Sequence, residues 1–221
     1  LECSDAHGMR YKLGIERNHK NDYKIRINGE KATSLAALSR LLPLIVIDST
    51  SFTLLDGSSS DRRKFLDWGV FHVEQTYGDV WKRFQKALKQ RNQLLRHGRI
   101  EEESLCAWTA ELVPLSEQVS RLRDKYLSGL VKHVREVARL FDGLGSLDIE
   151  YYQGWSAETA LAEVMSGDKK RDFSVGTTSH GAHKADMRIK VDGVPASEGL
   201  SRGQTKLLVY ALKLAQATYF R

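Results

Sequence analysis

The stretch Gly199-Leu200-Ser201-Arg202-Gly203-Gln204 leads directly into residues 205–216, whose apolar positions recur with helical spacing. A helix that begins here would bring free N–H groups, a serine hydroxyl and the positive end of its dipole to one point. Such a point binds anions, and phosphate in particular. Serine before an apolar helix is also the ordinary N-cap residue. The six residues alone therefore leave a phosphate site and a simple helix cap both open.

The composition is that of an ordinary soluble globular protein. Hydrophobic residues make up 41% and charged residues 28% of the 221 positions, and no apolar run reaches the roughly 20 residues that span a bilayer. Residues 1–5 do not resemble a signal peptide, so we expect a cytoplasmic location. The net charge of +6 favours a polyanionic partner without identifying one. The chain lacks a first methionine and stops at Arg221 after an apolar helix, which predicts that it belongs to a longer protein.

The first 47 residues predict an antiparallel hairpin, a short helix and a buried strand. Residues 9–15 and 23–27 alternate between apolar and polar side chains, with polar turn residues at 18–22 and the turn pair Asn28-Gly29 after the second strand. Residues 34–42 predict a short helix that Pro43 ends. The continuous apolar run 44–47 predicts a strand that is covered on both faces.

Residues 61–126 predict helices. Asp61 can cap the first of them, and the adjacent Arg62 and Arg63 project about 100° apart, so that one could face an internal carboxylate and the other phosphate or water. Residues 77–99 form a basic helix, with Gly98 as its C-cap and Arg91 on its apolar face. From residue 101 a heptad rhythm predicts a second long helix, antiparallel to the first, in which Pro114 should cause a kink or a break.

The last third predicts strands at 147–152 and 187–191, a helix at 157–166 capped by Ser156, and a polar linker at 167–172. His180 and His183 have no third ligand nearby, and Cys3 and Cys106 are far apart, so neither a metal site nor a disulfide is expected. A G-x-S-x-G motif and a G-x-x-x-x-G-K-[ST] loop are both absent from the sequence. We therefore expect no catalytic residue and no complete nucleotide site in this chain.

Four blocks resemble, in order, stretches of the bacterial RecF family, a group of DNA-repair ATPases whose ABC-type head is related to the heads of SMC proteins. The blocks are Ser59-Ser-Asp-Arg-Arg-Lys-Phe-Leu-Asp67, Lys89-Gln-Arg-Asn-Gln-Leu-Leu95, Thr178-Ser-His-Gly-Ala-His-Lys-Ala-Asp186 and Leu200-Ser-Arg-Gly-Gln-Thr-Lys-Leu-Leu208. The resemblance extends over nearly the whole chain from about residue 40. It implies an internal fragment that lacks the Walker A and Walker B regions.

The resemblance implies a mixed α/β fold, part of an ABC-type ATPase head with antiparallel sheet elements and a mainly α-helical antiparallel arm. Residues 1–60 would be a β-rich part of the head, residues 61–142 the arm, and residues 143–221 the remaining head segment. That last segment would contain the signature motif. Its residues Ser201, Arg202, Gly203 and Gln204 would contact the ATP that the opposite subunit holds.

The function that the resemblance implies is recombinational DNA repair, with parts in DNA replication and the SOS response. The parent protein would bind DNA, ATP and Mg²⁺, dimerise around ATP, hydrolyse it weakly, and assist RecA loading at single-strand gaps with RecR and RecO. The fragment alone should be inactive as an ATPase. Six cations are the candidates for DNA contacts: Arg62, Arg63, Lys82, Arg83, Lys86 and Lys89. The alternative is a non-enzymatic, SMC-like helical-arm scaffold whose basic face binds a partner protein or nucleic acid.

Overall fold

The computed structural model describes residues 1–4, 8–17, 23–32, 34–96 and 102–220. The chain divides into two compact units, Leu1–Val46 and Ile47–Arg221. Both the helices and the antiparallel sheets of the predicted mixed fold are present. The domain boundaries predicted after residues 60 and 142 stay predictions.

The first unit is a four-stranded antiparallel sheet with one helix. Its strands β1 (Glu2–Ser4), β2 (Arg10–Arg17), β3 (Tyr23–Ile27) and β4 (Glu30–Lys31) pair in chain order, and α1 spans Leu35–Leu41. Leu13, Ile25 and Leu38 form the buried centre of a small core. The predicted hairpin strands are confirmed, and so is the Asn28-Gly29 turn, where both residues have positive φ as a type I′ turn requires.

Two further predictions for this part of the chain are not confirmed. The polar turn at residues 18–22 lies outside the described residues. The strand predicted at residues 44–47 is wrong, because that run forms no strand and Leu44 and Val46 are about two-thirds exposed. Within the described ranges no strand lies beside it to pair with its backbone.

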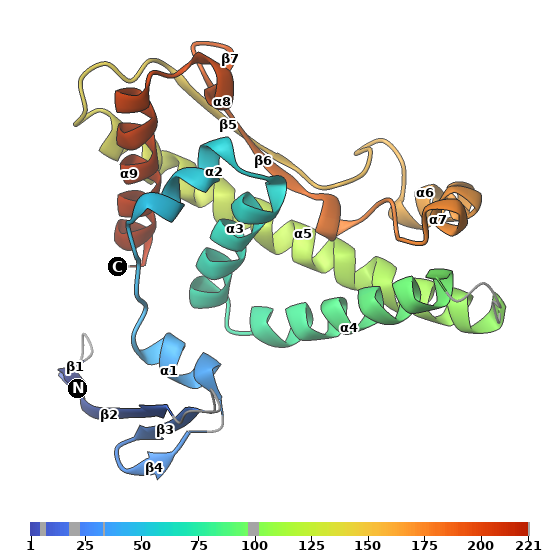
Figure 1. Ribbon diagram of the computed structural model, residues 1–221, viewed down its shortest axis with the longest axis horizontal. Helices are drawn as coiled ribbons and strands as arrows, with labels where there is room; N and C mark the ends of the chain where they lie inside the picture. Colours follow the sequence, from blue (N-terminus) through green and yellow to red (C-terminus); the bar gives the residue numbers. More distant parts are fainter. Residues whose placement is uncertain (5–7, 18–22, 33, 97–101, 221) are drawn as a thin grey trace. The chain divides into compact units, whose positions relative to one another are not determined.

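The second unit is mainly helical and contains a three-stranded antiparallel sheet in the order β5-β6-β7. Its elements are the 3₁₀ turn η1 (Ser49–Phe52), α2 (Thr53–Asp56), α3 (Ser59–Val73), α4 (Tyr77–Arg96), α5 (Glu102–Ala138), β5 (Leu147–Tyr152), α6 (Leu161–Gly167), α7 (Lys169–Val175), the 3₁₀ turn η2 (Ala182–Lys184), β6 (Asp186–Val191), β7 (Val194–Pro195), α8 (Ala196–Gly199) and α9 (Arg202–Tyr219). Figure 1 shows α4 antiparallel to the first part of α5, and α9 packed near the other end of α5. The antiparallel helix pair predicted from the heptad rhythm is thus confirmed. None of the helices in the described ranges is both long and apolar enough to cross a membrane.

The predicted N-cap of α3 is wrong, and of the kink or break predicted at Pro114 the break does not occur. Helix α3 is capped by Ser58 rather than by Asp61. The Asp61 carboxylate accepts a hydrogen bond from the Ser58 N–H and so completes a capping box. Pro114 lies inside α5 without ending it, because the buried side chains on either side of it keep the helix packed on the core. The predicted C-cap Gly98 lies outside the described residues.

The segment between β5 and β6 also differs from its prediction. Helix α6 begins at Leu161 rather than at 157, because Ser156 accepts a bond from the Glu158 N–H in a turn that precedes the helix. The stretch predicted as a polar linker contains helix α7, which buries Asp172. The charged side chains of Lys170 and Arg171 are exposed on the outer side of that helix.

A buried polar network fixes α3, α5 and η2 to one another. The Arg123 guanidinium donates to both carboxylate oxygens of Asp67, at 2.7 and 3.0 Å, and to the Ala182 carbonyl at 2.6 Å. Tyr77 donates its hydroxyl to Asp67 as well, and burial raises the pKa of Tyr77. A buried charge that kept no partner would cost several kcal/mol, so each group here is held by the others.

Candidate functional site

The start of α9 is built as a capping box. Ser201 has extended backbone angles, its hydroxyl accepts from the Gln204 N–H at 3.3 Å, and the Gln204 side chain accepts from the Ser201 N–H at 3.0 Å. The Ser201 carbonyl accepts from the Thr205 N–H at 2.9 Å. The N–H groups of Ser201, Gln204 and Thr205 thus have acceptors. The N–H groups of Arg202 and Gly203 have no acceptor within the helix. The helix cap and an anion-binding helix start are therefore compatible at this position.

The side chains at this helix start face outward. Ser201, Arg202 and Gly203 are all exposed, and among the described residues no carboxylate forms an ion pair with Arg202. Only Gln204 reaches back to the rest of the unit, where its side-chain amide donates to the Gly143 carbonyl at 2.9 Å. The predicted signature residues thus form one exposed group at the positive end of an 18-residue helix.

Gly203 has no steric role inside the described chain. A Cβ added there would find its nearest atom, the Ser201 hydroxyl oxygen, at 3.9 Å, and the residue does not have positive φ. Glycine inside a helix is about 0.5–1 kcal/mol less stable than alanine. The glycine at this position is therefore unexplained by the folding of this unit and is consistent with the close approach of another molecule to the backbone.

Three of the predicted DNA-contact residues form one stripe along α4. Lys82, Lys86 and Lys89 are exposed, and steps of four and three residues place them within about 60° of one another around the helix. Lys82 approaches Asp79 at 3.6 Å, whereas Lys86 and Lys89 form no ion pair with any carboxylate in the described ranges. Arg83 is rotated about 100° from this stripe and pairs with Glu111 of α5 at 2.7 Å.

Arg62 and Arg63 lie apart from that stripe and have internal partners. Arg62 donates through Nε and Nη2 to the two carboxylate oxygens of Asp186, at 2.7 and 3.1 Å. Arg63 donates to the Ala185 carbonyl and to the Ser59 hydroxyl, both at 2.8 Å. The suggestion that one of the two arginines faces an internal carboxylate is correct for Arg62. Both residues attach α3 to the start of β6.

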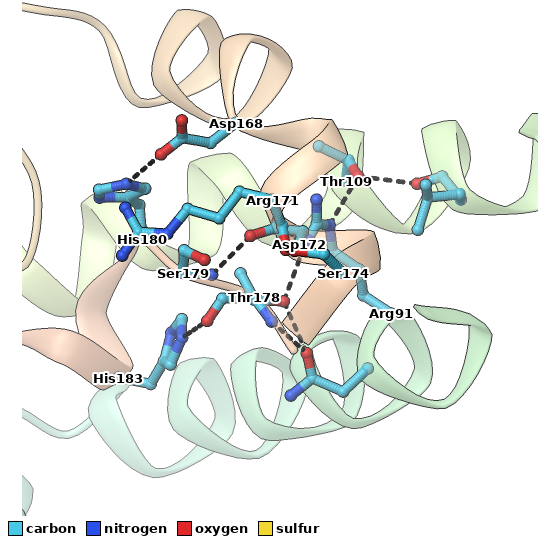
Figure 2. A network of polar contacts seen from close by, with 12 residues as sticks. Arg91, Thr109, Asp168, Arg171, Asp172, Ser174, Thr178, Ser179, His180 and His183 are labelled. Carbon is cyan, nitrogen blue, oxygen red and sulfur yellow. Dashed lines mark hydrogen bonds and ion pairs between the residues drawn. The ribbon is translucent and has the colours of Figure 1, made fainter. Parts of the chain in front are cut away.

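The loop before β6 is held by a polar network that the sequence did not reveal (Figure 2). Arg91 is 1% exposed and donates through Nη1 to Asp172 at 2.7 Å and to the Thr178 hydroxyl at 2.8 Å. Asn92 accepts from both the N–H and the hydroxyl of Thr178, at 2.8 and 2.7 Å. The sole sequence signal was an arginine on the apolar face of α4; its partner Asp172 lay in the supposed linker.

The two histidines of this loop have polar partners next to the same network. His180 pairs with Asp168 at 2.6 Å, and His183 Nε2 donates to the Thr178 carbonyl at 2.8 Å. The other ring nitrogen of His183 is buried and has no hydrogen-bond partner among the described residues, and burial lowers the pKa of this histidine to about 4. In the part of the chain that the structure describes, no three metal-binding side chains come together.

Comparison with known proteins was made by sequence and by structure. No family model matches the chain. The DNA replication and repair protein RecF of Pseudomonas aeruginosa strain LESB58 is 44% identical over 211 residues, and that of Pseudomonas syringae pv. tomato strain DC3000 is 41% identical over 211 residues. Each alignment includes 96% of this chain but only 57–58% of the relative. The chain therefore spans little more than half the length of these relatives.

Two solved structures have the same fold. They are the recombination mediator protein RecF in its RecF-ATPrS and RecF-ATP forms in the RecFOR pathway, with TM-scores of 0.85 and 0.87. Both align with 96% of this chain and 60% of their own length, at 20% sequence identity. They identify the mixed helix and sheet architecture as that of RecF ATPases.

Proposed function

Because the chain belongs to the RecF family, we propose that it is the central region of a DNA repair protein that binds ATP and DNA and dimerises in an ATP-dependent way. The proposal includes the work of that protein in the RecFOR pathway, with RecR, RecO and RecA as partners in RecA loading at single-strand gaps. It also includes a cytoplasmic location and a role in the SOS response. ATP would bind together with Mg²⁺, mainly to the opposite subunit. The present chain alone would not hydrolyse ATP.

One observation carries the nucleotide part of this proposal. Ser201, Arg202 and Gly203 are exposed at the start of α9. The N–H groups of Arg202 and Gly203 have no acceptor within the helix. Because Gly203 has no side chain, a ligand can come close to the backbone there, and no contact within the described chain requires a glycine at this position. These groups suit the terminal phosphate of a nucleotide bound to a second copy of the protein.

A bulky cation at the helix cap tests this assignment. In the intact protein, Ser201→Arg should leave ATP binding by each monomer unchanged but abolish ATP-dependent dimerisation, because the new side chain fills the space that the phosphate needs. Nucleotide binding is measured by equilibrium titration and dimerisation by analytical ultracentrifugation. Normal dimerisation of a variant that still binds ATP would disprove the role of this segment in the second subunit's site.

The DNA part rests on the stripe of Lys82, Lys86 and Lys89 on α4. Lys86 and Lys89, which form no ion pair within the described ranges, are free to neutralise phosphates, and each contact that is lost should reduce the salt dependence of binding by about 0.9 in log–log slope. The charge of Arg83 is partly neutralised by Glu111, and Arg62 is held by Asp186 and the Gly57 carbonyl with a side chain only 18% exposed. We propose that Lys86 and Lys89 contribute most.

Charge reversal tests the stripe. Changing Lys82, Arg83, Lys86 and Lys89 to glutamate in the intact protein should weaken duplex DNA binding at least tenfold, with a smaller salt slope. A matched pair makes the test local: Lys86→Glu with Lys89→Glu should weaken binding, whereas Lys132→Glu with Arg139→Glu, an equal charge change at exposed positions beyond the predicted stripe, should have little effect. Equal losses for the two pairs would indicate a general charge effect. That result would contradict the assignment of the DNA contacts to this stripe, and no effect of either pair would favour the alternative, a scaffold whose basic face binds a partner protein or another nucleic acid.

A further inference from the structure

A cavity of about 460 Å³ opens between α5 and α6, with Arg91 of α4 in its wall. Its lining consists mainly of apolar and small side chains and includes two cations, Arg91 and Lys169, but no carboxylate. The size lies within the range of ordinary small-molecule sites. The cavity is separate from the start of α9 and from the lysine stripe of α4.

Arg91 has hydrogen-bonding capacity that the folded unit does not use. Its Nε donates to the Thr109 hydroxyl at 2.9 Å, and its Nη1 donates to Asp172 and Thr178. Its Nη2 donates to no atom within the described ranges. Nε and Nη2 share one edge of the planar guanidinium, so Nη2 lies on the side of Thr109, which itself lines the cavity. A side chain that is 1% exposed thus keeps two N–H donors for a ligand.

Lys169 supplies a second cation at the same cavity. Its ammonium pairs with Glu102, whose side chain is 76% exposed, whereas the Lys169 side chain is 33% exposed. An ion pair with so exposed a partner contributes little stability, so an incoming anion can replace Glu102 at small cost. The rest of the wall, with Leu105, Val113 and Met165, offers apolar surface.

We propose that this cavity binds a ligand in which a carboxylate is joined to a compact apolar group. The carboxylate accepts from Nη2 of Arg91 and from the Lys169 ammonium, and the apolar group packs among Leu105, Val113 and Met165. A small free acid and the carboxyl end of a polypeptide both have this chemistry. The two sources differ in whether a peptide bond follows the bound group.

Binding to the intact protein is measured by isothermal titration with four probes. These are 4-methylpentanoate, its primary amide, acetyl-Gly-Leu with a free carboxylate, and acetyl-Gly-Leu amide. Each carboxylate should bind at least tenfold more tightly than its amide, because the amide loses the charge-assisted bonds. Tighter binding of the peptide acid would identify a polypeptide end as the source, and tighter binding of 4-methylpentanoate a free acid. Equal binding of acid and amide, or no binding of either acid below roughly 10 mM, would overturn the proposal.

A variant that fills the cavity locates the binding. Ala110→Leu places an aliphatic side chain into the lining, at an exposed helical position that should tolerate it, and should weaken acid binding at least tenfold. Ala107→Leu is the matched control, since Ala107 is an exposed residue of the same helix that does not line the cavity. Equal binding by both variants would place the acid elsewhere and overturn the assignment.

Discussion

The substitution Gly203→Ala separates what α9 needs for folding from what we propose it does for a second subunit. Gly203 is the second residue of the helix, and its added Cβ would have 3.9 Å to the nearest atom. Alanine is more stable than glycine in a helix by about 0.5–1 kcal/mol. The free energy of unfolding should therefore stay unchanged or rise by up to about 1 kcal/mol.

The same methyl group should harm the proposed contact. Arg202 and Gly203 contribute the two N–H groups that remain at the helix start, and a Cβ beside them hinders a phosphate that approaches the backbone. We expect ATP-dependent dimerisation of the intact protein to weaken at least tenfold. Urea unfolding measures the stability, and sedimentation velocity with ATP and with ADP measures the dimerisation.

Gly167→Ala is the matched control. Gly167 is the last residue of α6, it does not have positive φ, and nothing lies within 4 Å of its added Cβ. This variant should dimerise with ATP as the parent protein does. Normal dimerisation of Gly203→Ala would refute the close approach, and a loss of stability above about 1 kcal/mol would mean that the fold itself requires the glycine.

Two further predictions concern the network of Figure 2. Burial lowers the pKa of His183 from its ordinary 6.5 to about 4, so between these pH values the unfolded state binds a proton that the folded state does not. The free energy of unfolding should hence be unaffected by His183 above pH 6.5 and fall by roughly 3 kcal/mol between pH 6.5 and pH 4, relative to the same titration of His183→Gln. Parallel curves for the two proteins would contradict this. Asp172→Asn should destabilise the chain by about 3–5 kcal/mol in urea unfolding, because it leaves the buried Arg91 charge without its carboxylate, whereas a loss below about 1 kcal/mol would show that the ion pair is dispensable.

Local patterns predicted those elements whose cause is local. The strands around Asn28-Gly29 and the two long helices follow from side-chain periodicity, and the cap at Ser201 follows from the residue type. The prediction of a linker at residues 167–172 was wrong, because three consecutive cations suggested an exposed segment. These residues instead begin helix α7, which buries Asp172. Asp172 is 81 residues from Arg91, and no local pattern indicates a pair so distant in sequence.

The contacts show which of the four resembling blocks the fold itself explains. The first block is joined to the third through Arg62 and Asp186, and the second is joined to the third through Asn92 and Thr178. These three blocks therefore consist largely of residues that hold one another in place inside the unit.

The fourth block differs from them. Its helix beyond residue 207 is packed, but at its start Gln204 alone forms a hydrogen bond to a described residue outside the block, the Gly143 carbonyl. Ser201 is explained by its cap on the helix, whereas within the described residues Arg202 forms no ion pair and Gly203 has no steric role. Since the other blocks are explained by internal contacts, Arg202 and Gly203 are the residues for which we propose an external ligand. In the proposed dimer, a phosphate that the second subunit presents would be the acceptor for the N–H groups of Arg202 and Gly203.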